Sequence, residues 1–163
     1  MNRLIRPLDP KADLPLVEEF YTRAADYWLL ADRRAPDRQK ALDFFTDCPP
    51  NCDPAASHRL GLFVDGALMG LAELSFGWPA PGDAYLGLQI LAPEARGHGL
   101  GRVLLAEVET RARAAAAPCL YLAVLEANPK GRAFWEREGF QATGVSRDDA
   151  ETGHRIHRLA KRL

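Results

Sequence analysis

The stretch RGHGLG at residues 96–101 is the part of this 163-residue sequence that most constrains its fold. It follows an apolar run, Ala84 to Leu91, and precedes residues 102–116, which are dense in Ala, Leu, Glu and Arg. The pattern predicts a strand over 84–91, then a glycine-rich turn, then a helix over 102–116. Glycines let a backbone approach a ligand closely, and the unpaired N–H groups of a helix start favour an anion. The turn is therefore predicted to bind a phosphate or pyrophosphate; without a ligand it would be only a tight connection.

The sequence of this turn does not match two familiar nucleotide-binding loops. A P-loop has Lys and then Ser or Thr after its last glycine, whereas Arg102 and Val103 follow here. The dinucleotide loop G-x-G-x-x-G needs a glycine at position 102, which is Arg. The glycine-rich turn is therefore neither a P-loop nor a dinucleotide-binding loop.

A second stretch, NPKGRAFWEREGF at residues 128–140, lies after a predicted strand over 119–125 and contains a predicted helix over 129–138. The first stretch has the pattern R-x-x-G-x-G, preceded by LAPE at 91–94. The second has Asn, Ala, an aromatic pair and Gly-Phe in that order. Together the two resemble the GNAT superfamily of acyl-CoA-dependent N-acyltransferases. The resemblance covers about residues 58 to 145, and the first 57 residues only by the order of elements.

The remaining elements complete an α/β (α+β) fold. The dipeptide Asp65-Gly66 favours a two-residue hairpin turn between strands over 58–64 and 67–76. Further predicted elements are a strand over 4–6, helices over 12–30 and 36–46, and closing strands over 140–145 and 154–159. We predict one domain over residues 1–163 with a mixed, mostly antiparallel central sheet flanked by helices, as in the GNAT-like fold.

Composition narrows the class of partner. The chain has 21 Lys and Arg against 22 Asp and Glu, a net charge of −1, so neither nucleic acid nor a membrane is expected as a partner. No apolar run approaches the roughly 20 residues that span a bilayer, and residues 1–10 lack the apolar core of a secretory signal. A cytoplasmic location and reduced cysteines are therefore expected. Cys48 and Cys52 have no second ligand pair, so no metal is expected.

The resemblance implies acetyl-CoA as acyl donor and assigns residues to it. Backbone groups near Ile90 and Leu91 would pair with the pantetheine arm like an extra strand. The pyrophosphate would be held by amides of the loop, namely Arg96, Gly97, His98, Gly99, Leu100, Gly101 and Arg102. The other side would be lined by Asn128 and by the helix face that carries Phe134 and Trp135. Arg102, or Lys130 with Arg132, would reach the phosphates unless these are only solvated helix charges.

Acyl transfer to an amine needs a neutral amine, and an ordinary lysine-type amine has a pKa of about 10.4, so a base is useful. By resemblance the Leu91 N–H would polarise the thioester carbonyl. Many relatives carry a carboxylate on the strand that runs here over 84–91, and this strand has none. The candidate catalytic groups are Asp83, Tyr85 and Glu73, with Gln89 to position a water. Asp83 is equally explained as a turn residue.

Position 135 departs from the family pattern. In many relatives the second aromatic residue of the late helix is a Tyr proposed to protonate the departing thiolate, whereas here it is Trp135. An indole N–H does not give up its proton at accessible pH, so that role does not carry over. Tyr121, Tyr85 or water would replace it, or the thiolate would leave unprotonated. Packing against Phe134 and Phe140 also explains Trp135.

The acceptor site is expected beside the first helices and the loop over 77–83. Asp26, Tyr27, Trp28 and Trp78 offer aromatic surface with a nearby carboxylate, which suits a small cationic amine, although Tyr27 and Trp28 also fit a buried helix face. The predicted function is transfer of an acetyl group from acetyl-CoA to a primary amine of a small molecule by direct attack. The alternatives are a protein or peptide amine, which predicts an open groove, and a catalytically weak acyl-CoA-binding module. A homodimer is a further alternative, in which two chains pair through their sheets or through the last strand, 154–159.

Overall fold

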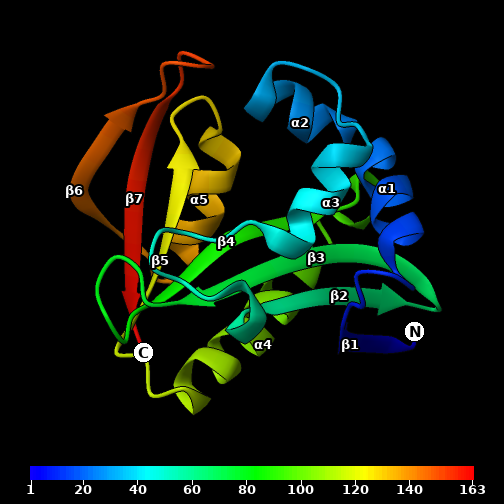
Figure 1. Cartoon of the computed structure of the whole chain (residues 1–163), viewed down its shortest axis with the longest axis horizontal. Helices are drawn as coiled ribbons and strands as arrows, with labels where there is room; N and C mark the ends of the chain where they lie inside the picture. Colours follow the sequence, from blue (N-terminus) through cyan, green and yellow to red (C-terminus); the bar gives the residue numbers. More distant parts are fainter.

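A seven-stranded sheet forms the centre of the molecule in the computed structural model, which describes all residues from 1 to 163 (Figure 1). The strands are β1 (Arg3–Pro7), β2 (His58–Val64), β3 (Ala67–Phe76), β4 (Ala84–Leu91), β5 (Cys119–Leu125), β6 (Gln141–Asp148) and β7 (Arg155–Arg162). Their order in the sheet is β1-β2-β3-β4-β5-β7-β6, and only β4 and β5 pair in parallel. The predicted mixed, mostly antiparallel sheet is confirmed.

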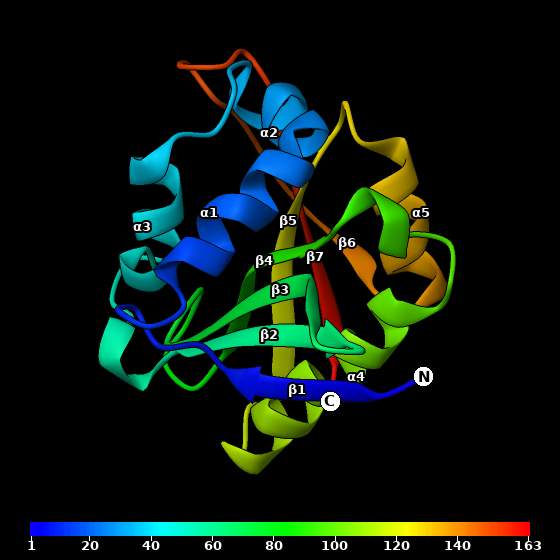
Figure 2. The same cartoon turned by 90° about the vertical axis from the view of Figure 1, so that its right-hand side faces the viewer.

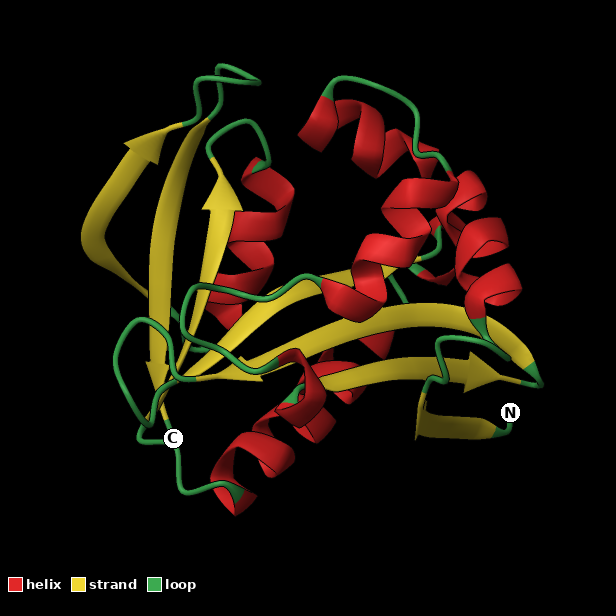
Figure 3. Ribbon diagram, in the orientation of Figure 1, coloured by secondary structure: helices red, strands yellow, loops and turns green.

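Helices cover both faces of this sheet. They are α1 (Leu14–Arg23), α2 (Ala25–Asp32), α3 (Arg38–Thr46), α4 (Leu100–Ala114) and α5 (Pro129–Arg137), with short 3₁₀ turns at Pro54–Ala56 and Pro93–Ala95. Figure 3 shows α1 to α3 above strands β2 to β4 and α4 below them. No helix combines the length and the apolar character needed to cross a membrane.

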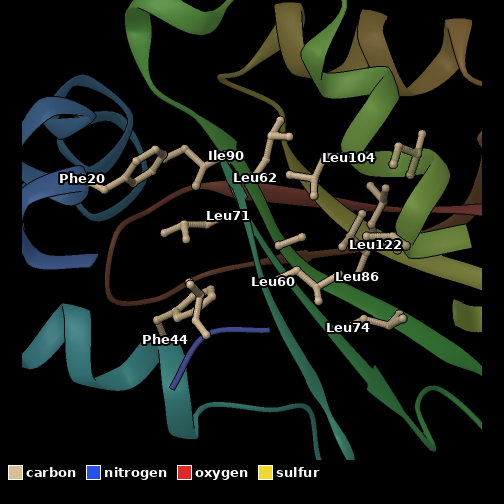
Figure 4. Packing of buried hydrophobic residues seen from close by; sticks show 14 of the residues in the cluster. Phe20, Phe44, Leu60, Leu62, Leu71, Leu74, Leu86, Ile90, Leu104 and Leu122 are labelled. Carbon is tan, nitrogen blue, oxygen red and sulfur yellow. The ribbon is translucent and has the colours of Figure 1, made fainter. Parts of the chain in front are cut away.

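The core lies between the helices and the middle strands, because β2 and β3 are apolar on both faces and both faces are covered. Figure 4 shows Phe20 of α1 and Phe44 of α3 beside this sheet, with Leu104 of α4 among the core side chains. Phe20 and Leu104 are fully buried. Burying each such side chain stabilises the fold by about 1.5–3 kcal/mol. The predicted hairpin is confirmed, since Asp65 and Gly66 both have positive φ, 49° and 84°, as a type I′ turn requires.

The single helix predicted over 12–30 is wrong. The structure has two helices, α1 and α2, that meet at Ala24, where φ is −95° and ψ is 24°. No Gly or Pro marks this break in the sequence, and Ala24 is fully buried. After the break, Asp26 in the first turn of α2 forms an ion pair with Arg96 of the glycine-rich loop. Tertiary contacts therefore set the direction of α2, and helix periodicity does not reveal it.

The last two strands are longer than predicted, and the sequence did not indicate their order in the sheet. β6 ends at Asp148 and β7 at Arg162, and β7 lies between β5 and β6. The last strand therefore has both edges paired and cannot pair with a second chain. β6 forms one edge of the sheet, and each of its residues is exposed.

Candidate functional site

A cleft opens where the parallel strands β4 and β5 separate. They pair only over three residues, from Ala84 to Leu86 of β4, and then diverge (Figure 1). The gap has a volume of about 1320 Å³ and is lined by the later halves of both strands, the glycine-rich loop, α5, α2 and α3. This volume exceeds that of a typical small-molecule pocket, roughly 300–1,000 Å³, and leaves room for an extended donor and a second substrate.

The backbone of Leu91 faces this cleft. Ala92 donates its N–H to the Met69 carbonyl at 2.9 Å, so Met69 and Ala92 form a hydrogen-bonded pair of the antiparallel ladder. The next pair, Gly70 and Leu91, is then a non-hydrogen-bonded pair, whose N–H and C=O groups point away from β3. The Leu91 carbonyl accepts a hydrogen bond from Arg96 Nε at 3.2 Å on that side. The Leu91 N–H is therefore free to meet a ligand.

The same alternation distinguishes the neighbours of Leu91. The backbone of Ile90 pairs with Leu71 of β3, so its N–H and C=O groups are directed to β3. Ile90 lines the cleft without offering these groups to a ligand. Gln89 shares the orientation of Leu91, and its side-chain amide nitrogen donates to the Gly101 carbonyl at 3.0 Å. The Gln89 Oε1 is buried without a hydrogen-bond partner.

The glycine-rich loop exposes backbone N–H groups to the cleft. Gly97 and Gly99 both have a φ of 78°, which explains the choice of glycine, and open space surrounds the position of a Cβ at either residue. No side chain caps the N-terminus of α4 and no acidic residue lies in its first turn, so its N–H groups remain available for an anion. Gly101 has a different role, because a Cβ there would lie 3.2 Å from the Phe134 ring.

The charged side chains of this loop are held by carboxylates from other elements. Arg96 forms an ion pair with Asp26 of α2 at 2.6 Å, and Arg102 forms one with Glu138 at 3.1 Å. Both arginines line the cleft, as does Lys130. His98 is exposed and does not line the cleft, and Arg132, which pairs with Glu136 at 2.8 Å, does not line it either.

The helix α5 forms the opposite wall. Asn128 caps it by accepting a hydrogen bond from the Gly131 N–H at 3.0 Å, and Asn128 also lines the cleft. Phe134 and Trp135 line it too, with their ring centroids 4.9 Å apart. Trp135 packs edge-on against Phe140 at 5.5 Å. Its surroundings therefore fit the packing role that the sequence left open.

Glu73 is a buried carboxylate that lines the cleft between β3 and β4. It accepts a hydrogen bond from the Ser75 hydroxyl and lies 3.8 Å from Arg59 Nη2. Burial raises the pKa of the Glu73 carboxyl, while Ser75 and Arg59 act in the opposite direction. Tyr85, opposite Ser75 in the strand register, also lines the cleft, and burial raises the pKa of its phenol, which stays neutral.

Three residues singled out from the sequence lie away from the cleft. The Asp83 carboxylate accepts a hydrogen bond from the Ala80 N–H at 3.3 Å, which is the alternative role of a turn residue. Trp78 lies under the Arg158 guanidinium, 5.7 Å from it, and Tyr121 also lies outside the cleft lining. Of the four catalytic candidates, the structure brings Glu73, Tyr85 and Leu91 to one cleft.

Tyr27 and Trp28 both line the acceptor side, but Trp28 is covered. The Lys40 ammonium lies 4.4 Å from the Trp28 ring and pairs with Asp32 at 2.9 Å. The protein's own cation therefore occupies the aromatic face that was expected to receive a substrate amine. The Trp28 indole N–H is buried without a partner.

Sequence reasoning missed several residues of this side, among them Tyr21, Asp43, Asp47 and Arg59. Asp43 lies in the last turns of α3, and Asp47 follows the helix in an extended conformation. Burial and the neighbouring Asp43 raise the pKa of the Asp47 carboxyl. Tyr21 and Arg59 carry no sequence signal, because only the packing of α1 and β2 brings them here.

The far end of the cleft is bridged. Arg33, just after α2, donates to the Thr152 carbonyl at 2.5 Å, and the buried His154 has its Nε2 2.7 Å from the Leu30 carbonyl. Thr152 and His154 belong to the connection between β6 and β7, so α2 and this connection meet across the opening between the two halves of the sheet (Figure 2).

Charge is divided along the cleft. We call donor half the side of the glycine-rich loop and α5, and acceptor half the side of α3, Glu73 and the β6–β7 connection. The charged residues lining the donor half are Arg96, Arg102, Lys130, Arg137, Asp26 and Glu138, four cations and two carboxylates. Those lining the acceptor half are Arg34, Lys40, Arg59, Arg147, Asp32, Asp43, Asp47, Glu73, Asp149 and Glu151, four cations and six carboxylates. The donor half thus favours an anion and the acceptor half a cation.

A mixed sheet with splayed β4 and β5 and an uncapped glycine-rich helix start is the architecture of an acyl-CoA-dependent acyltransferase. Residues 17–140 match the acetyltransferase (GNAT) family. The chain belongs to this family and is an N-acetyltransferase, as its sequence motifs predict.

Solved structures share the fold. An acetyltransferase from Thermus thermophilus is similar with a TM-score of 0.79 and 23% identity, covering 100% of this chain and 98% of that one. PaiA N-acetyltransferase from Thermoplasma acidophilum, solved in complex with coenzyme A, gives 0.72 and 24%, covering 100% of both chains. The ribosomal-protein-S18-alanine N-acetyltransferase from Escherichia coli gives 0.73 and 17%, covering 99% and 94%. Of these three neighbours, the enzyme from Escherichia coli is named for its acceptor, an alanine of ribosomal protein S18.

Proposed function

We propose that this enzyme transfers the acetyl group of acetyl-CoA to the primary amine of a small cationic molecule by direct attack. The observation that carries this proposal is the excess of carboxylates over cations in the acceptor half of the cleft. The Arg33 and His154 contacts bridge its far end, and carboxylates outnumber cations in its lining. A site of this charge that is bridged at one end suits a small ammonium better than a segment of folded protein.

The donor half has the features that acetyl-CoA requires. The free N–H groups at the start of α4 would receive the pyrophosphate, in a loop whose shape depends on the positive φ of Gly97 and Gly99. Arg96 and Lys130 add positive charge beside it. The Leu91 backbone would pair with the pantetheine arm, as an added strand pairs with a sheet edge. When bound, acetyl-CoA supplies the thioester carbonyl that the amine attacks. The Leu91 N–H would polarise this carbonyl.

Glu73 is the proposed general base. An amine must lose a proton before or during attack, and Glu73 is a buried carboxylate of β3 that lines the cleft beside β4. The ammonium first loses one proton to solvent, and the neutral amine nitrogen then forms a bond to the carbonyl carbon. The carbon–sulfur bond breaks, and the second amine proton passes to Glu73. The thiolate leaves and takes a proton from Tyr85 or from water, since the Trp135 indole does not release its N–H proton.

The test is release of free CoA with a panel of acceptors. One arm contains small amines, both cationic and neutral; the other contains peptides with free N-terminal or lysine amines. We expect turnover with small cationic amines and none with peptides. Turnover with peptides alone would replace the small acceptor by a protein acceptor. Acetyl-CoA binding without turnover on any amine would leave an acyl-CoA-binding module.

A further inference from the structure

Glu73 is held in place by a neighbouring strand. Arg59 of β2 lies directly opposite Glu73 in the strand register, and both residues are at least nine-tenths buried. The Arg59 guanidinium donates to the Phe44 carbonyl at 2.5 Å and to the Ser57 hydroxyl at 2.8 Å. These two bonds fix its plane, so that Nη2 is directed to Glu73 and has no hydrogen-bond partner of its own. A buried guanidinium in this state favours an ionised carboxylate beside it.

A glycine on the next strand makes room for the Glu73 carboxylate. The β3–β4 register shifts between Glu73 and Leu74, which leaves Gly87 as the extra residue of a β-bulge. A Cβ on Gly87 would lie 2.0 Å from Glu73 Oε2. The φ of Gly87 lies outside the left-handed region, so space and not backbone conformation demands glycine here. The Glu73 carboxylate thus occupies the space that a side chain at position 87 of β4 would fill.

We propose that Arg59, Ser75 and Gly87 are positioning residues for acetyl transfer, which together present the Glu73 carboxylate through the bulge of β4 to the acceptor amine. In this arrangement a side chain from β3 replaces the carboxylate that β4 itself lacks. Gly87 is exposed to the cleft, whereas Glu73 is buried beneath it. The inference rests on the proposed function, because it assigns these residues to the same site.

Several charged or titratable groups face Glu73. Arg59 comes from β2, Asp47 follows α3, and Tyr85 lies on β4. Cys52 lies in the connection before β2, and the pKa of its thiol is raised by burial and by the neighbouring Cys48 and Glu73. Among these groups Arg59 favours the charged carboxylate and Asp47 opposes it. Loss of Arg59 or of the Ser75 hydroxyl therefore raises the pKa of the Glu73 carboxyl further.

The first test titrates Glu73 directly and needs no acceptor. The protein is labelled with ¹³C at the glutamate carboxyls, and the Glu73 signal is assigned with Glu73→Gln. We expect its titration to move to higher pH in Ser75→Ala and in Arg59→Met, and to return toward the wild-type value in Arg59→Lys, which keeps the charge. Ser146→Ala, on the exposed strand β6, serves as control. An unchanged titration in both Ser75→Ala and Arg59→Met would overturn the proposal.

The second test is a double-mutant cycle between Gly87 and Glu73 in acetyl transfer. Gly87→Ala displaces the carboxylate and should lower kcat by about 10²-fold, the usual contribution of a positioned base, with unchanged acetyl-CoA affinity. In a Glu73→Ala background the same substitution meets no carboxylate and should cost nothing more. Equal losses in both backgrounds would overturn the role of Gly87. If no amine is acetylated at all, the proposed function fails, while the titration still decides the role of Arg59 and Ser75.

Discussion

Gly99 shows how one residue serves both backbone and ligand. Its φ of 78° is accessible to glycine at little cost, and open space surrounds it. It is also the N-cap of α4, where the helix offers free N–H groups. Gly82 has a similar φ of 86° and equally open surroundings, but lies in the loop before β4 and outside the cleft. The two glycines therefore form a matched pair.

Gly99→Glu adds bulk and a negative charge at the proposed pyrophosphate site. We expect acetyl-CoA affinity to fall at least tenfold, about 1.4 kcal/mol, as measured by calorimetric titration. Gly82→Glu should suffer the same backbone strain and keep wild-type affinity. Equal affinities in the two variants would show that the loop does not hold the pyrophosphate.

Glu73 determines the expected pH dependence of acetyl transfer. A base acts in its deprotonated form, so kcat/KM should fall as pH drops through the pKa of Glu73, which burial raises above its ordinary value. Glu73→Gln should lose this acidic limb and about 10²-fold or more of kcat, with acetyl-CoA affinity unchanged. The measurement is a pH–rate profile with a small amine. An intact acidic limb in Glu73→Gln would assign it to another group.

At the scale of elements, α2 connects the two halves of the site. Asp26 at its start pairs with Arg96 of the glycine-rich loop, and Leu30 near its end meets His154 of the β6–β7 connection. The Asp26–Arg96 pair is largely exposed, so it positions the loop and adds little stability. The buried His154 contact bridges the far end of the acceptor half. The break at Ala24 is what allows α2 to make both contacts.

His154→Ala should open the acceptor half without touching the donor half. We expect KM for the small amine to rise several-fold and acetyl-CoA affinity to stay unchanged. Loss of this buried hydrogen bond should also destabilise the fold by about 1–3 kcal/mol. His157→Ala is the control, because His157 lies on the adjoining strand β7 and pairs with Glu126 away from this contact. An unchanged KM in His154→Ala would mean that the bridge does not enclose the acceptor.

At the scale of the whole molecule, the splayed sheet joins two regions of opposite charge preference. Saturating acetyl-CoA, at about 100 times its Kd, should add about 2.7 kcal/mol to stability and raise Tm by several degrees. Thermal melting with NADH and ATP as controls checks this, because neither carries a pantetheine arm. A shift with acetyl-CoA alone supports the donor half. Absence of any shift would contradict it.

Local patterns explain why most elements could be predicted. The Asp65-Gly66 turn, the strand–glycine–helix run around RGHGLG and the NPKGRAFWEREGF stretch each depend on residues close together in the chain, and their periodicity and turn chemistry indicate the elements directly. The break at Ala24 and the position of β7 between β5 and β6 depend on contacts between distant segments. No local pattern reports these contacts.

The sequence by itself determined the family, the mixed sheet and the donor loop, because glycines at positive φ and a helix start are local features. Only the tertiary structure decided which carboxylate reaches the cleft. Asp83 and Glu73 were both candidates from the sequence, and packing placed Asp83 in a turn and Glu73 against Gly87. The physical reason is that a site made by three neighbouring strands depends on register and on a bulge, which long-range pairing sets.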